Sequence, residues 1–128
     1  MRNITAITAL PFNIPLLEDI TDSLPRHPTK VYPMRTVEQI DCITVHHMAS
    51  EAPLISQAAY HVNGRGWAAI GYTLVIYEGR LYQCNDLLAQ TNHSAGHNHH
   101  SVAISIHGDL SKRPMTSQER ELLYAGIL

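Results

Sequence analysis

The sequence predicts an α/β domain in which helices flank a central mixed β-sheet. Three features lead to this prediction: short segments of alternating apolar residues, a hairpin turn between two of them, and two helix-like segments with capping residues. With 128 residues, of which 45% are hydrophobic, the chain is long enough for one domain with its own core.

Four strands are expected, at residues 41–47, 70–77, 80–84 and 102–107. In the second of them, alternating apolar residues share a face with Tyr72 by the period of two. Tyr72 follows Gly71 directly at the start of this strand, where side chains often reach a cleft. The Glu78-Gly79 pair is a favourable hairpin turn, so the third strand is expected to return beside the second.

Two helices are expected, at residues 53–63 and 116–127. Pro53 and Gly64 bracket the first, in the positions that favour a helix start and a helix end. Thr116 and Glu119 have the spacing of a capping box at the start of the second.

Residues 1–35 are expected to be an N-terminal extension, and residues 36–128 the main domain. Prolines interrupt the extension, so that only a short helix near residues 16–23 is plausible in it. The first residues are no convincing signal peptide, because Asn and Pro break their apolar run, and synthesis in the cytoplasm is therefore expected.

The composition argues against several classes of protein. A net charge of −2 and the absence of a basic run argue against a nucleic-acid binder. No apolar run is long enough to span a membrane. The two cysteines, Cys42 and Cys84, are too few for a disulfide scaffold and are expected to be buried thiols.

Nine histidines are the one compositional excess. His46 closes a strand, where it is either a metal ligand or a hydrogen-bonded structural residue. A later segment resembles a metal-binding tract through His93, His97, His99 and His100. Gly96 and Asn98 indicate turns in it, which favours a solvated loop instead. His61 is expected to be exposed or packed at an edge, and His107 to be a satisfied strand residue.

Two aromatic residues have a structural and a functional interpretation. Tyr72 is either a core tyrosine with a bonded hydroxyl or a donor to a developing oxyanion near a metal. Trp67 is most simply an anchor between helix and sheet. The sequence contains no HExxH, CxxC, GxSxG or glycine-rich phosphate loop.

Four segments in this order resemble the N-acetylmuramoyl-L-alanine amidase family: TVHHMAS, AYHVNGRGWAAIGYTLVIYEGRLYQ, NHSAGHNHHSVAISIHGDL and the capped helix from Thr116. This is the amidase-2 group, which includes phage lysozyme-type amidases and animal peptidoglycan recognition proteins. The resemblance covers about Gln39 to Leu128. It implies a peptidoglycan recognition protein-like fold, with a groove that holds zinc on one face of the sheet.

The resemblance also implies a reaction and a partner. The partner is peptidoglycan or a muropeptide, and the reaction is hydrolysis of the amide between N-acetylmuramic acid and L-alanine of the stem peptide, which lyses the cell wall. Zinc would polarise the carbonyl and lower the pKa of its bound water to about 7.

Individual residues acquire roles only through this resemblance. His46 matches the first zinc ligand and Tyr72 the catalytic tyrosine. His93 and Asn98 match groove positions that contact substrate, with Trp67 nearby. His47, beside the ligand, is expected to line the groove.

The chain departs from the family pattern in its ligand set. The remaining zinc ligands of the family follow the last helix, and nothing follows Leu128, so the C-terminal part of the domain is expected to be missing. Two hypotheses stay open: a zinc amidase represented by its N-terminal portion, and a non-catalytic peptidoglycan-binding module. A structural domain of a phage particle is a third.

Overall fold

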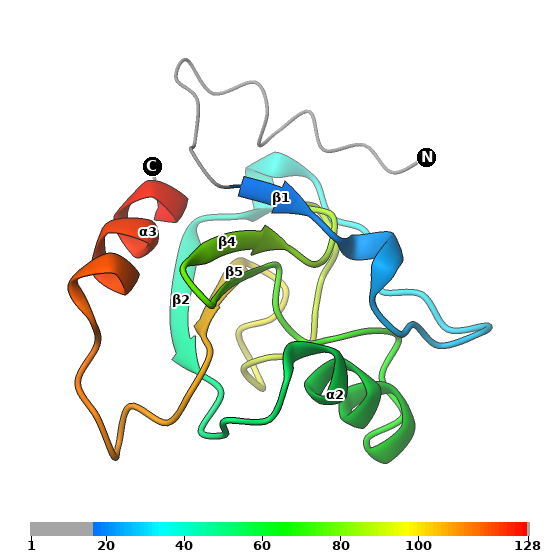
Figure 1. Ribbon diagram of the computed structural model, residues 1–128. Helices are drawn as coiled ribbons and strands as arrows, with labels where there is room; N and C mark the ends of the chain where they lie inside the picture. The colour runs from blue at the N-terminus through cyan, green and yellow to red at the C-terminus, as the bar shows by residue number, and fades with distance from the viewer. Residues whose placement is uncertain (1–16, 128) are drawn as a thin grey trace.

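The computed structural model describes residues 17–127, in which a five-stranded sheet lies between helical layers (Figure 1). The strands are β1 (Leu17–Asp19), β2 (Cys42–His47), β3 (Leu74–Tyr77), β4 (Arg80–Gln83) and β5 (Ser101–Ile106). The longer helices are α2 (Leu54–Ala59) and α3 (Ser117–Ile127). Shorter helical turns cover Thr21–Ser23, Val37–Gln39 and the π-helical segment Tyr60–Gly64.

The sheet is mixed, as predicted, with the strand order β1-β4-β3-β5-β2. The β3–β4 pair is antiparallel, and the β1–β4, β3–β5 and β5–β2 pairs are parallel. The hairpin turn between β3 and β4 uses Glu78 and Gly79 at φ of 49° and 75°, the left-handed conformation that a tight hairpin needs. The hairpin prediction is therefore confirmed.

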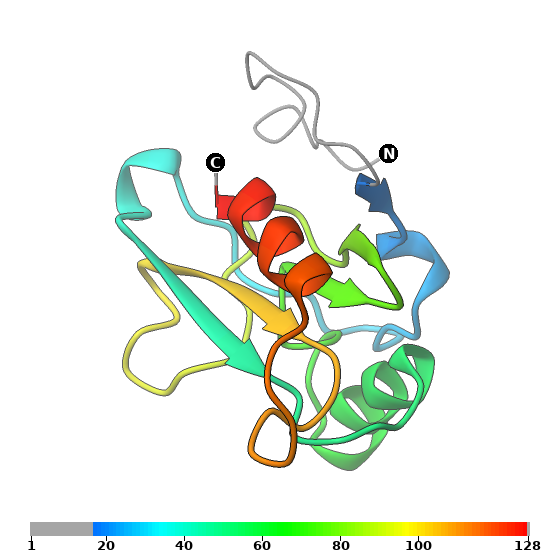
Figure 2. The same ribbon diagram turned by 60° about the vertical axis from the view of Figure 1, so that its left-hand side comes forward.

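The two faces of the sheet carry separate apolar clusters. Leu122 and Leu123 of α3 pack on one face, against Leu74, Ile76, Leu81, Ile104 and Ile106. Leu54 and Ala58 of α2 pack on the other, against Ile70, Val75 and Cys84. Figure 2 shows α3 lying over its face of the sheet. Alternation along β3 explains the division, since Val75 faces away from both of its neighbours.

The expected start of the second strand is wrong. The ladder begins at Leu74, and residues 70–73 bend instead. A Cβ atom on Gly71 would lie 2.2 Å from the carbonyl oxygen of Asn92, so only glycine fits this crossing of two chain segments. The crossing places Tyr72 beside the loop that carries His93.

The short helix expected near residues 16–23 is also wrong for its described part. Leu17–Asp19 is an edge strand paired with β4, and Ile20 continues the pairing by donating to the Gln83 carbonyl at 3.0 Å. Only Thr21–Ser23 is helical, as a single 3₁₀ turn. Pairing with a distant strand overrides the weak local helix preference.

Both predicted helices are present. The first changes from α-helix to π-helix at Tyr60, where the backbone N–H of Arg65 donates to the carbonyl five residues earlier. The capping box of the second is confirmed: Glu119 N donates to Thr116 Oγ1 at 3.0 Å, and Thr116 N donates to the Glu119 carboxylate at 2.9 Å. No helix within residues 17–127 is long and apolar enough to cross a membrane.

The described part of the N-terminal extension packs against the rest of the chain. Tyr32 and Arg35 are 6% and 5% exposed, and the Tyr32 hydroxyl donates to the Ala69 carbonyl. A domain boundary after residue 35 stays a prediction. Cys84 is buried as expected, whereas Cys42 is half-buried on the edge strand β2, which corrects the prediction for that thiol.

Candidate functional site

His46 lies at the end of β2 and faces a loop from much later in the chain. Its Nε2 atom lies 3.0 Å from Nδ1 of His93, and the two rings meet edge to face. The Ser94 hydroxyl lies 3.4 Å from the same Nε2 atom. The structure therefore brings together two of the histidines that the sequence analysis singled out, 47 residues apart.

Tyr72 completes this group. Its ring centroid is 5.7 Å from that of His46, so the two side chains lie on the same side of the sheet. Burial raises the pKa of the Tyr72 hydroxyl, while the Ser105 hydroxyl and Arg65 act in the opposite direction. Ser105 Oγ is buried and makes no hydrogen bond of ordinary geometry. Tyr72 is thus protonated at neutral pH and has a proton to donate.

His61 is buried beside Tyr72, which corrects the prediction that it is exposed or packed at an edge. It is 8% exposed rather than on the surface, and its Nδ1 atom accepts a hydrogen bond from the backbone N–H of Gly71 at 3.0 Å. Burial first, and Arg65 second, lower its pKa to about 4. A neutral His61 therefore fixes the bend that precedes Tyr72. In the sequence, the only signs of this role are the apolar residues beside His61 on its helix and Gly71 ten residues later.

The His46–His93 pair is uncharged at neutral pH. Burial, followed by the proximity of His47, lowers the pKa of His46. Burial, followed by the proximity of His46, lowers the pKa of His93 to about 4. The Nε2 atom of His93 is buried without a hydrogen bond of ordinary geometry, although the Ser101 backbone is close enough to raise that pKa. Two neutral imidazoles can accept or pass on a proton.

Two adjoining cavities open beside Tyr72 and His93, and we call them together the groove. His46 contacts both of these residues but lines neither cavity. One, of about 290 Å³, is lined by Met48, Gln57, Tyr60, His61, Arg65, Trp67, Tyr72, Asn92 and His93. The other, of about 430 Å³, is lined by Arg65, Trp67, Asn92, His93, Ser94, Ala95 and Asn98. Trp67 lines both and stacks with the Arg65 guanidinium at 5.2 Å, so it is more than an internal anchor.

Asn98 lines the groove, but its carbonyl oxygen is already engaged. Asn98 Oδ1 accepts hydrogen bonds from the backbone N–H groups of His93 at 3.0 Å and Ser94 at 2.8 Å. The Asn98 carbonyl oxygen therefore stabilises the turn that carries His93. Only its amide nitrogen remains available to a ligand.

Arg35 is a supporting residue that sequence reasoning missed, because it lies in the supposed extension. Its guanidinium donates to the carbonyls of Asn98 at 2.8 Å, Ser101 at 2.7 Å and Leu87 at 3.2 Å. These bonds tie both ends of the His93 loop to one buried cation. An arginine among prolines carries no sequence signal for this role.

His47 is the exception among the predicted site residues. It alternates with His46, so its side chain leaves β2 on the other side. Its Nδ1 atom accepts from the backbone N–H of Leu110 at 3.1 Å and lies 3.8 Å from the Asp109 carboxylate. It is not among the residues that line the groove. The expectation that His47 lines the groove therefore has no support from its position.

Comparison with known proteins was informative only at the level of structure. No protein-family model matches the sequence, and no curated protein sequence matches it. An endolysin from a Thermus scotoductus bacteriophage matches with a TM-score of 0.71 and 27% identity, over 84% of this chain and 73% of that chain. Bumblebee PGRP-SA matches with a TM-score of 0.72 and 20% identity, over 88% of this chain and 72% of that chain.

A third match is a structure of the peptidoglycan recognition protein LE. It was solved in complex with tracheal cytotoxin, a monomeric diaminopimelic acid-type peptidoglycan. The TM-score is 0.75 and the identity 18%, over 85% of this chain and 69% of that chain. This chain has the peptidoglycan recognition protein fold. The predicted fold family is thereby confirmed, whereas the expectation of a missing C-terminal part stays a prediction.

The resemblance in the sequence implied a zinc ion at His46, and the donor set tests that expectation. Catalytic zinc needs three protein ligands and a water. His46 and His93 supply two imidazoles, and no group of three or more His, Cys, Asp or Glu side chains within residues 17–127 is arranged to hold a metal ion. Residues 1–16 and 128 contain none of these residue types. The described residues therefore do not complete a zinc site.

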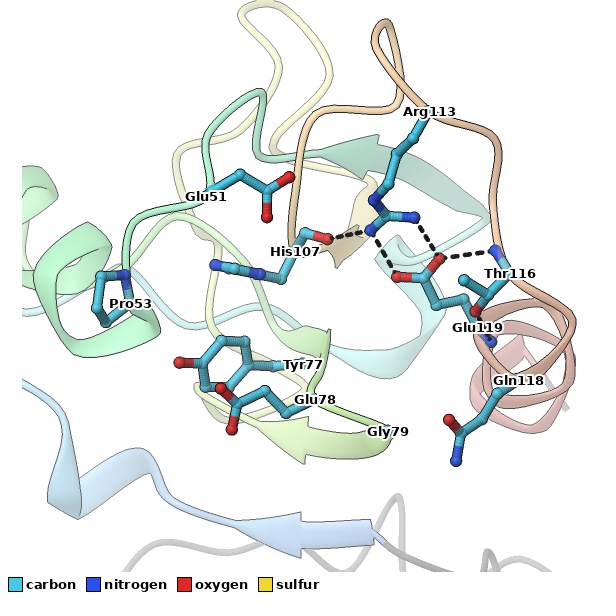
Figure 3. A pocket seen from close by; sticks show the side chains of 10 residues that line it. All are labelled: Glu51, Pro53, Tyr77, Glu78, Gly79, His107, Arg113, Thr116, Gln118 and Glu119. Carbon is cyan, nitrogen blue, oxygen red and sulfur yellow. Dashed lines mark hydrogen bonds and ion pairs between the residues drawn. The ribbon is translucent and has the colours of Figure 1, made fainter.

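A larger cavity of about 600 Å³ lies elsewhere on this fold, between the start of α2 and the start of α3 (Figure 3). Two of its charged side chains pair with each other, and its histidine bonds to the backbone. His107 Nε2 donates to the Ala52 carbonyl at 2.6 Å, and Arg113 makes two 2.8 Å bonds to Glu119. The hydrogen bonds from Arg113 hold the pKa of the Glu119 carboxyl below its usual range. We call this the α3 cavity.

Proposed function

We propose that this protein acts on bacterial peptidoglycan as an amidase, hydrolysing the amide between N-acetylmuramic acid and L-alanine of the stem peptide. The observation that carries the proposal is the contact of His46 with His93 and Tyr72, two residues that line the groove. A fold shared with a phage endolysin, and with a recognition protein that holds a peptidoglycan fragment, supports it. In this account the protein is made in the cytoplasm and acts on the cell wall.

The groove offers suitable chemistry for a muropeptide. Trp67 presents an aromatic face to a sugar ring or an alanine methyl group. Arg65 is a fixed cation in both cavities, placed to pair with a carboxylate of the stem peptide. The amides of Asn92 and Asn98 are suited to the peptide groups and the acetamido group. This combination of apolar walls and a few polar groups is typical of ligand sites.

Hydrolysis adds a water oxygen to the lactyl carbonyl carbon, breaks the C–N bond and leaves the proton on the alanine nitrogen. Negative charge develops on the carbonyl oxygen, and the protonated Tyr72 hydroxyl is a donor suited to it. The neutral His46–His93 pair is suited to take a proton from water and return it to the leaving amine. Tyr72 and His46 are the catalytic residues in this proposal.

A second function is favoured by one specific observation. The described residues present two imidazole donors where catalytic zinc needs three ligands. A groove of this shape without a complete metal site would bind muropeptides and leave them intact. The 128-residue chain by itself would then be a peptidoglycan-binding module, and further ligands would be needed for hydrolysis.

Purified cell walls distinguish the two functions. The protein is incubated with them, with and without added zinc, and the L-alanine N-termini released are counted together with the protein that pellets with the walls. Release of N-termini supports the amidase. Pelleting without release supports the binding module. A folded protein that neither pellets nor releases alanine contradicts both, and His46→Ala is the control for release by a contaminant.

A further inference from the structure

We propose that His97 and His100 form a second site for a divalent transition-metal ion, on the surface and separate from the groove. Asp41 orients His100 from behind. The site does not depend on the function of the groove, and none of its three residues lines a groove cavity.

The separation of the two ring nitrogens is that of ligands to one ion. His97 Nδ1 lies 3.3 Å from His100 Nε2. With metal–nitrogen bonds of about 2.0–2.1 Å, this separation corresponds to a ligand–metal–ligand angle of roughly 107°, close to tetrahedral. The rings now share a hydrogen bond, so an ion would take the place of the shared proton after a small rotation of the rings on an exposed loop.

Asp41 fixes which nitrogen of His100 is free. Its carboxylate lies 2.7 Å from His100 Nδ1, so that this nitrogen carries the proton and donates it. Nε2 is then left as the lone-pair atom, and it is the atom that faces His97. A carboxylate behind a histidine in this way sets the ring orientation and raises its basicity as a metal ligand.

Backbone hydrogen bonds hold the three residues in place without any metal. His97 N donates to the Ser94 carbonyl at 2.9 Å, His100 N to the His97 carbonyl at 3.3 Å, and Asp41 N to the His100 carbonyl at 3.0 Å. The turn uses Gly96 at φ of 85°. The sequence analysis took the turn residues as evidence against ligand spacing. In the structure the same turn brings the ring nitrogens of His97 and His100 to 3.3 Å from each other.

The chemistry and accessibility of the site define its ligand. His97 is exposed, and the side chains of His100 and Asp41 are 27% and 75% exposed, so an ion can enter from solvent. Imidazole nitrogens favour zinc, copper and nickel over magnesium and calcium. Two nitrogens with water in the remaining positions make a weak and labile site, consistent with the absence of any three-residue group in residues 17–127.

Binding would cross-link His97 and His100 within the loop that follows His93. The experiment is a calorimetric zinc titration near pH 7.5 of the His46→Ala protein, so that the groove does not contribute. We expect one zinc per chain, with affinity at least about tenfold weaker in the added variants His97→Asn and His100→Asn. Asp41→Asn should weaken binding by about 10–100-fold, as loss of such a partner does elsewhere.

His99→Asn is the matched control, because His99 is an exposed neighbour whose ring meets that of His100 edge to face without belonging to the pair. It should bind zinc as the parent does. Thermal melts without metal check that every variant is folded. If the His97→Asn/His100→Asn double variant, folded, binds zinc with parental affinity, the proposal is wrong. Equal loss in His99→Asn would also overturn it, because the tract would then bind as a generic histidine cluster.

Discussion

The groove and the α3 cavity differ in size and in the polar side chains that line them. The α3 cavity is larger than either part of the groove, at about 600 Å³ against about 290 and 430 Å³. Two of its charged side chains, Arg113 and Glu119, already bind each other. In the groove, the Tyr72 hydroxyl and two neutral imidazoles lie at the edge of open space. Cavity volume therefore does not identify the site, whereas a protonated hydroxyl and neutral imidazoles beside a cavity do.

The arginines of the two regions also differ in how far along the chain their contacts reach. The polar contacts between Arg113 and Glu119 span six residues, within one loop and one helix. The groove joins β2, the bend at Gly71 and the His93 loop, and Arg35 ties that loop down over a separation of 63 residues. Changes to the groove should therefore affect activity and stability together, and changes to the α3 cavity mainly stability.

The largest difference between the regions is expected for their histidines. Under the proposed amidase activity, His46→Ala should slow alanine release by about 10²–10⁴-fold, because a proton acceptor in the transition state is lost. His107→Ala in the α3 cavity should leave the rate nearly unchanged once folding is matched. Release of L-alanine N-termini is the measurement. Equal losses in both variants would remove the distinction between the regions.

The same comparison between the groove and the α3 cavity can be made with Tyr72 and Tyr77. Tyr72→Phe keeps the ring and removes one donor, so turnover should fall by about 10²–10³-fold. Tyr77→Phe, whose ring packs on His107, is the matched control and should retain the parental rate. Initial rates at saturating cell-wall concentration decide the outcome. A Tyr72→Phe protein with full activity would make Tyr72 a core residue and nothing more.

Arg35 holds the His93 loop of the groove, and Arg113 holds the start of α3 at the α3 cavity. Replacing each arginine compares the stability of the two regions. Arg35→Met leaves three carbonyls without their donor in a buried place and should lower the free energy of unfolding by about 3 kcal/mol. Arg113→Met breaks a half-exposed ion pair and should cost about 1 kcal/mol or less. Urea unfolding measures both. Similar midpoints for the two variants would contradict the bracing role of Arg35.

The last effect is expected from pH, through the two neutral histidines His61 and His93. The folded-state pKa values of His61 and His93 are lowered to about 4, whereas unfolded histidine titrates near about 6.5. Below about 6.5 the unfolded chain binds more protons, so stability should fall as pH drops toward about 4. His61→Asn keeps an acceptor for Gly71 and should flatten this slope. Urea midpoints unchanged between pH 7 and pH 4.5 in the parent would contradict the lowered pKa values.

The sequence predicts the parts of this structure that depend on local patterning. Alternation, the Glu78-Gly79 turn and the Thr116 capping box place the strands and helices within a few residues. It fails where distant segments meet. The bend at Gly71 is set by contact with Asn92, and the β1 strand exists only through pairing with β4.

In the candidate site, too, some residues could be identified from the sequence and others could not. His46, Tyr72 and His93 were identified through family resemblance, and the structure places them together, although their roles stay predictions. His61 and Arg35 act through backbone groups far away in the sequence, so residue type and spacing give no sign of them. His47 was expected in the groove because it neighbours His46, whereas strand alternation directs it to the other side.

The central claim is that the groove, rather than the α3 cavity, receives peptidoglycan, and Trp67 offers a direct test. It is the single tryptophan in the chain and lines both groove cavities. A soluble muropeptide is titrated while Trp67 fluorescence and the histidine and tyrosine side-chain resonances are followed. We expect a saturable change in Trp67 emission, accompanied by shifts of His93 and Tyr72. Saturable binding that shifts Tyr77 and His107 and leaves Trp67 unchanged would contradict the claim.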